Sequence, residues 1–396
     1  MGWLSAQKFC SDECVLERTQ GVSLREFVNR PHCAHFITLC LAFALLDVKY
    51  GIASAADSAQ NLATSKVDVL PILSYDTDAG VGYGIKSFFL NFSGRSESFD
   101  IVLFNSTKGD RWYKGVFSIP DFEMRQGTAY PLALDVTVDY DKWIHYNFFG
   151  IGNASAASQE ESYTREPLEI SAMLSRGITE RMVMQAGAGY RVVRNFDFES
   201  GSRLAVLPPS ENAGRLSYLS LRTSIRYDSR NSFINPSEGL VLQGELERSP
   251  GGSLNDCDFT RYGFWIQSYH PLNDSSIVFA VRAGLQILDG SNLPVQVLLP
   301  VGGTSTLRGY PQDRFLDRIS AVSNAEVRFP FYRRFGGVVG YDLGDVWESV
   351  SRIGVARWKS DVNGGLRFYF DTFVVRLDVG LSAESTGFYL NFGQLF

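Results

Sequence analysis

Side chains that commonly carry catalysis or bind metals are few in this chain of 396 residues, and they are poorly spaced for either task. Only two of the four histidines, His145 and His270, lie beyond residue 35, and Ser305 has no histidine or lysine near it in the sequence. No G-x-S-x-G motif occurs, and the cysteines and histidines near the N-terminus lack the spacing of a zinc finger. We therefore expect that the protein is not an enzyme and needs no cofactor or metal.

The stretch GGTSTLRGYPQDRF, residues 302–315, places Arg308 between a leucine and a glycine. Its glycines and proline are typical of a connection, yet a solvated loop has little use for Leu307 and Tyr310. In a partly desolvated site, the guanidinium of Arg308 would need a carboxylate partner, which suits its planar fork. The alternative is a surface arginine beside a turn glycine.

The composition favours an all-β protein. Aromatic residues make up 13% of the chain, with 29 Phe and 18 Tyr, and there are 37 Gly but only 14 Pro. Beyond about the first sixty residues, charge or glycine interrupts every longer apolar stretch, so no apolar helix of the roughly 20 residues that a membrane requires is predicted there. The formal net charge of −6 provides no general basic field, so we expect no nucleic-acid partner.

Apolar and polar residues alternate along the chain from residue 70. In FVVRLDVGL, residues 373–381, Val375, Leu377 and Val379 fall on one face of an extended strand, whereas Arg376 and Asp378 fall on the other. A soluble sandwich would bury the apolar face, and a membrane barrel would turn it to lipid. Runs of about nine to fourteen residues favour a single transmembrane antiparallel barrel of about sixteen strands. The predicted strands lie near residues 70–76, 81–91, 98–107, 111–119, 130–140, 166–177, 181–193, 215–228, 238–249, 258–270, 275–288, 318–332, 335–345, 359–370, 373–382 and 386–396.

Loop lengths and the last strand also favour a barrel. The longest predicted connections, 141–165, 194–214, 289–317 and 346–358, all fall at one end of such a sheet, as the outer loops of bacterial barrels do. The stretch DKWIHYNFFG around His145 is interpreted as an aromatic girdle at the membrane interface. The last strand, GFYLNFGQLF, has an apolar face that we interpret as facing lipid. A final aromatic residue there resembles the assembly signal of outer-membrane barrels, which here would comprise Phe388, Leu390, Phe392 and Phe396.

The N-terminal region has the features of an export signal. An apolar stretch from Phe36 to Leu46 is followed by Ala53-Ser54-Ala55, the A-x-A pattern typical of signal-peptide cleavage. We predict a leader over residues 1–55, a short periplasmic linker over 56–69 and the barrel over 70–396. Only Cys257 lies beyond the leader, so no internal disulfide is expected. The alternative is an N-terminal amphipathic helix of the mature protein.

Several segments resemble the BamA/TamA superfamily of outer-membrane assembly and translocation barrels, also called the bacterial surface antigen family. Leu307-Arg308-Gly309-Tyr310, preceded by Gly302-Gly303, is similar to the sixth-loop motif of that family, usually V/L-R-G-F/Y. The resemblance is specific from about residue 225 onward and rests on alternation alone before it. The other segments that carry it are SIRYDSRNSFINPSEGL (224–240), NAEVRFP (324–330), YDLGDVW (341–347), GLRF (365–368), RLD (376–378) and GQLF (393–396).

The resemblance implies a structural role for Arg308. The sixth loop of this family folds back into the barrel, and its arginine meets acidic residues of the inner wall, which here would be Asp342 and Glu326. A glycine after the arginine would let the backbone approach the wall, and the following tyrosine would supply packing. We call the resulting set the lumenal lock and expect it to be structural rather than catalytic. It comprises Arg308, Gly309, Tyr310, Glu326, Asp342 and Gly344.

The resemblance also implies a protein of the bacterial outer membrane that aids the insertion or translocation of proteins or lipids. Members of the family carry periplasmic POTRA domains before the barrel, whereas residues 56–69 leave room for none, so we expect a POTRA-less member. The expected partners are outer-membrane lipid (lipopolysaccharide or phospholipid), client proteins or lipids, and the barrel-assembly machinery for its own insertion. We expect a monomer. The alternative is a passive channel or surface antigen that kept the barrel without assembly activity.

Overall fold

The computed structural model describes residues 15–16, 65–76, 80–208, 211–212, 214–253, 255–272, 276–354, 358–370 and 373–396. The described residues form a 17-stranded antiparallel sheet that includes the two-residue strand β1 (Val15–Leu16), so sixteen longer strands remain, as predicted. These strands are β2 (Lys66–Asp76), β3 (Gly80–Leu90), β4 (Ser98–Ser106), β5 (Arg111–Ile119), β6 (Tyr130–Phe148), β7 (Glu161–Gly177), β8 (Met182–Phe196), β9 (Arg215–Asp228), β10 (Gly239–Ser249), β11 (Asp258–Leu272), β12 (Ile277–Ser291), β15 (Ile319–Tyr332), β16 (Phe335–Trp347), β17 (Lys359–Tyr369), β18 (Val374–Leu381) and β19 (Thr386–Phe392).

Shorter elements lie in the connections between these strands. Strands β13 (Leu299–Val301) and β14 (Phe315–Asp317) pair with each other in a separate two-stranded sheet. The described helices are α4 (Phe122–Arg125) and the 3-10 turns η2 (Ala157–Gln159), η3 (Leu204–Val206), η4 (Val295–Val297) and η5 (Val350–Arg352). None of these described helices is long and apolar enough to cross a membrane.

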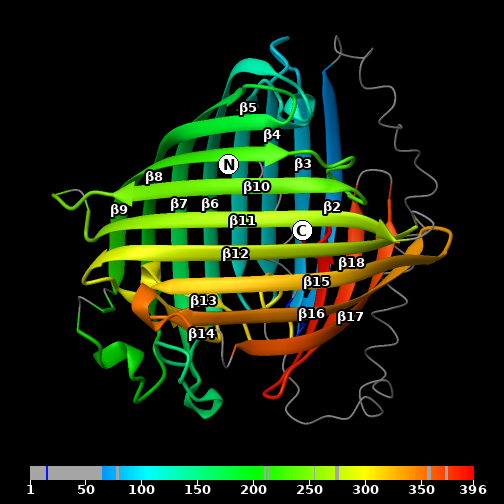
Figure 1. The fold of residues 1–396 in the computed structure, drawn as a ribbon. Coiled ribbons are helices and arrows are strands. Elements are labelled where there is room, and N and C mark those ends of the chain that lie inside the picture. The colour runs from blue at the N-terminus through cyan, green and yellow to red at the C-terminus, as the bar shows by residue number, and fades with distance from the viewer. Residues whose placement is uncertain are drawn as a thin grey trace.

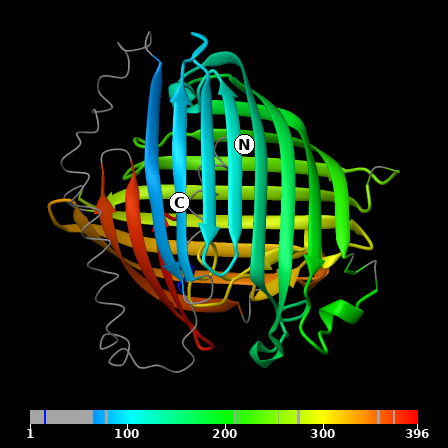
Figure 2. The same cartoon turned by 180° about the vertical axis from the view of Figure 1, so that it is seen from behind.

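Consecutive long strands pair in chain order, from β2 to β12 and then from β15 to β19. Figures 1 and 2 show them as a curved wall around a lumen, which confirms the predicted all-β barrel. The alternation in β18 explains the two faces of this wall. Arg376 and Asp378 point into the lumen and are buried, whereas apolar residues of neighbouring strands, such as Val339 and Leu366, stay exposed on the outer face.

The long connections gather at one end of the barrel, which we call the outer end (Figure 1). An apolar core that includes Leu204, Phe259 and Val297 joins two of these connections, 197–214 and 292–318, to the ends of the adjacent strands. Backbone hydrogen bonds join the loops, for example from Val295 N to the carbonyl of Glu211 at 2.7 Å. The outer loops are therefore packed together.

Strand β6 is longer than predicted, and its extra length changes the interpretation of the predicted aromatic girdle. The strand continues to Phe148, so the connection predicted over 141–165 shortens to residues 149–160. Tyr146 hydrogen-bonds to Asp313 of the connection 292–318, and Phe148 belongs to the apolar core of the outer loops. These two aromatic side chains therefore support the outer loops and do not form a lipid-facing girdle.

The two ends of the sheet meet without a described ladder. Among the described residues, no register joins β19 to β2, and β19 pairs only with β18 and, through Phe388 and Tyr389, with the dipeptide β1. Strand β2 begins at Lys66, so the linker predicted over 56–69 ends earlier than expected. The rest of the predicted leader lies outside the described residues.

Candidate functional site

Arg308 lies inside the barrel on the long connection 292–318, which we call loop six. Its Nε donates to Asp342 Oδ2 at 2.8 Å, and its Nη2 donates to Asp342 Oδ1 at 2.9 Å. Its Nη1 donates to Glu326 Oε1 at 2.6 Å. All three side chains are 0% exposed. A guanidinium this deeply buried requires such partners, because an unpaired buried charge would be costly.

The strand registers explain why the two carboxylates converge on one guanidinium. Glu326 is in β15 and Asp342 is in the adjacent β16, and Asn324 lies directly opposite Asp342. Residues two apart on a strand share a face, so Asn324 and Glu326 both point into the lumen. Asn324 also donates to Asp342 Oδ1 at 2.8 Å, which holds that carboxylate in place for Arg308.

A second group of charged side chains surrounds Arg308 and its two carboxylate partners. Arg328 donates to the other oxygen of Glu326 at 2.8 Å, and Asp378 accepts from Arg367 at 2.5 Å. Asp378 also lies 3.6 Å from Arg308 Nη1. We call Arg308 with its two carboxylate partners, Asp342 and Glu326, the clamp. The clamp is part of a lumenal network of charged side chains that spans β15 to β18.

The backbone of loop six touches the wall directly at this point. A Cβ on Gly309 would lie 2.6 Å from Asp361 Cβ and 2.7 Å from Ser382 N, so a side chain there could not be accommodated without a shift. On the wall itself, a Cβ on Gly380 of β18 would overlap the carbonyl of Arg308. Glycines on both sides of the contact permit this close approach.

The remaining lock residues lie beside the clamp. Tyr310 is buried in an apolar cluster with Leu307 and Phe315, and its carbonyl accepts from Tyr389 Oη of β19 at 3.2 Å. A Cβ on Gly344 would lie 2.9 Å from Val301, so this wall glycine makes room for the loop. The structure therefore brings together the six residues of the proposed lumenal lock.

Several residues of the site were not predicted from the sequence. Arg314, also on loop six, is 1% exposed and donates to Glu384 at 2.7 Å and to Ser155 Oγ at 2.9 Å. Arg282 of β12 donates to Asn324 Oδ1 at 2.7 Å. The hydrogen-bond partners of Arg314 and Arg282 lie 23 to 159 residues away in the sequence. The alternation within a single strand does not define the register between strands that brings such partners together.

The predicted assembly signal divides into two parts. Phe388 and Leu390 alternate with the buried Tyr389, so they lie on the outer face of β19, and the side chain of Phe392 lies outside the described part of the structure. Phe396 contradicts the prediction that it faces lipid. Strand β19 ends at Phe392, Gly393 adopts a φ of 84°, and the chain then turns inward.

Residues 393–396 pack inside the lumen near its other end, which we call the inner end. Phe396 is 4% exposed and clusters with Tyr269, Val278, Ala280 and Leu395. Its carbonyl accepts from Arg328 Nη2 at 3.0 Å, and the Arg328 guanidinium lies 4.9 Å from its ring centroid. The positively charged Arg328 of β15 stabilises this inward position of Phe396. Alternation within the last strand does not reveal that contact.

The residues considered for catalysis lie apart from one another. His145 is exposed on β6, a ring nitrogen of His270 lies 2.7 Å from Ser268 Oγ, and the Ser305 carbonyl accepts from Arg282 Nη2 at 2.5 Å. Within the described ranges, no group of three or more His, Cys, Asp or Glu could hold a metal ion.

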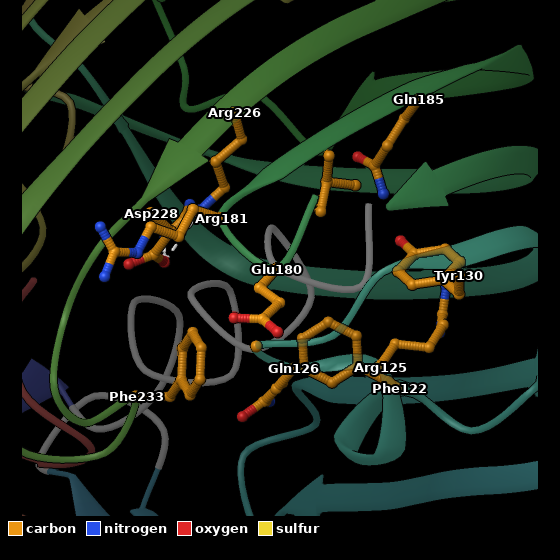
Figure 3. A pocket seen from close by; sticks show the side chains of 12 residues that line it. Phe122, Arg125, Gln126, Tyr130, Glu180, Arg181, Gln185, Arg226, Asp228 and Phe233 are labelled. Atoms are coloured by element: carbon orange, nitrogen blue, oxygen red, sulfur yellow. Dashed lines mark hydrogen bonds and ion pairs between the residues drawn. The ribbon is translucent and has the colours of Figure 1, made fainter. Parts of the chain in front are cut away.

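A pocket lies at the inner end, between the connections 120–129, 178–181 and 229–238. Phe122, Tyr130 and Phe233 contribute aromatic rings to it (Figure 3). Its Arg125 is ion-paired with Asp135 at 2.5 Å, and its Arg226 is ion-paired with Asp228 at 2.9 Å. Because both guanidinium groups are already engaged, we assign no ligand to this pocket.

Comparison with known proteins identifies the family. The model described as the Omp85 superfamily domain matches residues 91–396. BamA from Haemophilus ducreyi, in a structure lacking POTRA domains 1-3, is similar, with a TM-score of 0.60 and 16% identity over 83% of this chain and 70% of that chain. No curated protein matches the chain.

Two structures of CdiB are also similar. CdiB from Escherichia coli has a TM-score of 0.59 and 12% identity, and CdiB from Acinetobacter baumannii has a TM-score of 0.51 and 14% identity. Both alignments cover 83% of this chain, but only 62% and 59% of the respective CdiB chains. At such identities the likeness shows the fold alone. Together with the family match over most of the chain, it shows that this bacterial outer-membrane barrel belongs to the Omp85 superfamily.

Proposed function

We propose that the protein aids the insertion or translocation of proteins or lipids at the outer membrane, through the seam between β2 and β19. The observation that carries this proposal is that, among the described residues, no register joins these two strands and the free edge of β19 pairs only with the dipeptide β1, in a wall whose other neighbouring long strands are paired. Unpaired strand edges are templates for another strand. Pro71 in β2 supports the proposal further, because proline has no N–H to donate to a ladder.

The lumenal lock supports the same function by bracing one side of the seam. Arg308 and Gly309 lie against β18 at Gly380, and the Gly309 carbonyl accepts from Ser385 Oγ at 2.8 Å, just before β19. The clamp on β15 and β16 ties this contact to the neighbouring wall. In this proposal, loop six holds the β19 side in place, while the β2 side separates to admit a client.

The contents of the lumen argue against the alternative, a passive channel. Loop six and residues 393–396 both occupy the interior, and the outer loops pack around a shared apolar core. A freely conducting pore would require these segments to leave. As partners we propose unfolded outer-membrane polypeptides or lipids as clients, and the barrel-assembly machinery for the insertion of this chain, which we propose acts as a monomer.

A reversible crosslink across the seam tests the proposal. In a Cys257→Ser background, one cysteine replaces Phe388 of β19 and the other is scanned over residues 66–72 of β2. The matched control is Val379→Cys with Phe388→Cys, because these residues are directly opposite each other in the paired strands β18 and β19. The assay is the insertion of a reference barrel protein into proteoliposomes that contain the full chain.

We expect insertion to fall when the seam pair is oxidised and to recover on reduction, while the oxidised control pair leaves insertion unchanged. Full crosslinking of the seam with undiminished insertion would show that clients do not use it. No insertion by the wild-type chain, with a measurable ion conductance instead, would favour the passive channel.

A further inference from the structure

A row of cationic side chains crosses the outer face of the barrel near its outer end, over strands β5 to β9. Arg111 of β5 lies directly opposite Lys142 of β6, and Arg194 of β8 lies directly opposite Arg215 of β9. Figure 2 shows these strands side by side, with the outer loops at their lower ends. Between the two pairs is one acidic residue, Glu166 of β7, directly opposite Arg194.

Alternation along the strands places these side chains on the outer face. Trp112 and Lys114 of β5 are buried toward the lumen. Adjacent residues on a strand point to opposite faces, so Arg111, the first residue of β5, points outward. In the same way, Val193 and Asn195 are buried on either side of the exposed Arg194. Cross-strand partners share a face, so Lys142 and Arg215 point outward as well.

The row has more positive charge than its own residues neutralise. Glu166 accepts from Arg194 at 2.9 Å and from Tyr140 Oη at 2.7 Å, which accounts for one cation. Among the described residues, no carboxylate lies within ion-pairing distance of Arg111 or Arg215. Asp110 and Asp256, in the adjoining outer connections, accept from the backbone N–H groups of Ile144 and Ser217.

In each pair, two like charges lie directly opposite each other on neighbouring strands. Such a pair destabilises a sheet unless an anion lies between the two charges. In both pairs the charges face outward, where a ligand could reach them. The sheet therefore carries an arrangement that is unfavourable without a ligand and favourable with a bridging anion.

The position of the row relative to the membrane identifies the kind of anion. Two residues further into the wall, Tyr113 lies opposite Tyr140, and their rings stack with centroids 5.7 Å apart. Beyond these tyrosines the outer face is apolar, with Val138, Ile170 and Leu221 exposed. Tyrosines at the edge of an apolar band mark the membrane interface, so the cations lie about 7 Å outside it, at the level of lipid headgroups.

We propose that the row formed by Arg111, Lys142, Arg194 and Arg215 binds the phosphate groups of a phosphorylated lipid in the outer leaflet. Arginine forks and the lysine ammonium suit phosphate oxygens, and the separation into two pairs suits a headgroup with more than one phosphate. The acyl chains of the lipid would pack on the apolar band below. This site is independent of the seam and of loop six.

The test compares two variants with equal loss of charge. The row variant combines Arg111→Gln, Lys142→Gln and Arg215→Gln, and the control combines Arg176→Gln, Arg181→Gln and Arg333→Gln, which are exposed at the inner end. The probes are diphosphoryl lipid A, the same lipid without its phosphates, and inorganic phosphate. Binding to the purified full chain is measured by native mass spectrometry and by titration in detergent micelles.

We expect the row variant to bind diphosphoryl lipid A about tenfold more weakly or worse than wild type, and the control variant to bind it as wild type does. The lipid without phosphates should bind all three proteins equally weakly. Equal losses in both variants, or no loss in the row variant, would overturn the site.

Full competition by millimolar inorganic phosphate would also contradict a lipid site, because the lipid should gain affinity from its chains. If the row variant does not fold, the single substitution Arg215→Gln is measured against Arg176→Gln, and equal affinities there would overturn the proposal in the same way.

Discussion

Arg308 of loop six donates two parallel hydrogen bonds to the two carboxylate oxygens of Asp342 on β16, at 2.8 and 2.9 Å. This geometry requires a planar guanidinium, since an ammonium group cannot form the same fork. A third bond, to Glu326, fixes the side chain against a second strand. In our account, this clamp holds loop six inside the barrel and braces the strands beside the seam.

Arg308→Lys should preserve the charge of the clamp but not its function. We expect loop six to be cut more readily by added protease than in the wild type, because the lysine can satisfy only one carboxylate well. Arg318→Lys, in the same connection, is the control, since Arg318 is not in the clamp. Equal protection of loop six in both variants would mean that the paired hydrogen bonds are unimportant.

Gly380→Ala should displace loop six without removing a single hydrogen-bonding group. The new Cβ would overlap the Arg308 carbonyl, and overpacking of this kind costs about 1–3 kcal/mol. Gly364→Ala, on the adjacent strand β17, is the matched control, because its Cβ would lie 3.7 Å from the nearest atom, Val338 O. Protease sensitivity of residues 292–318 should rise in the first variant alone. A similar effect of both substitutions would refute the close contact.

Phe396→Ala should destabilise the folded barrel more than Phe388→Ala. Phe396 is buried in the lumen, where truncation of a phenylalanine costs about 3 kcal/mol, whereas Phe388 faces outward on β19. Urea unfolding in liposomes, followed by heat-modifiable gel mobility, measures the difference. A larger effect at Phe388 would contradict the inward packing of Phe396.

Cys257 should report on the packing of the outer loops. Burial raises the pKa of its thiol to about 12, so the thiol stays protonated in the folded barrel at pH 8. We expect alkylation there to be about a thousandfold slower than in the unfolded chain, because the raised pKa lowers the fraction of reactive thiolate at pH 8 by about that factor. Because the folded pKa exceeds the usual value of 9.0, the stability from the buried thiol should decrease as pH rises above 9.0 toward 12. Rapid alkylation of the folded barrel at pH 8 would show that the outer core is open.

The sequence was most informative where a strand has two different faces. In β18, charged residues alternate with aliphatic ones, and a lumen on one side and lipid on the other produce that pattern. Motif resemblance then indicated Arg308 and its two carboxylates. Spacing alone could not, because the partners are 18 and 34 residues away and meet only through the strand register.

The sequence misled where a strand leaves the membrane or a chain segment turns inward. Tyr146 and Phe148 keep the alternation of a lipid-facing strand, yet β6 has already passed the membrane and supports the loops. Phe396 follows the same apolar pattern, but the positive φ of Gly393 ends the strand and redirects it. In each case a long-range partner, Asp313 or Arg328, favours the observed position.

A double-mutant cycle on Arg308→Ala and Asp342→Asn tests the central claim, that a buried ion pair anchors loop six in the lumen. We expect Arg308→Ala to lower the free energy of unfolding by about 3–5 kcal/mol, because it leaves buried carboxylates without their partner. The double variant should lose less than the sum of the two single losses, by more than about 1 kcal/mol, since both substitutions remove one shared interaction. Strict additivity, with loop six equally protected from protease in every variant, would contradict the account.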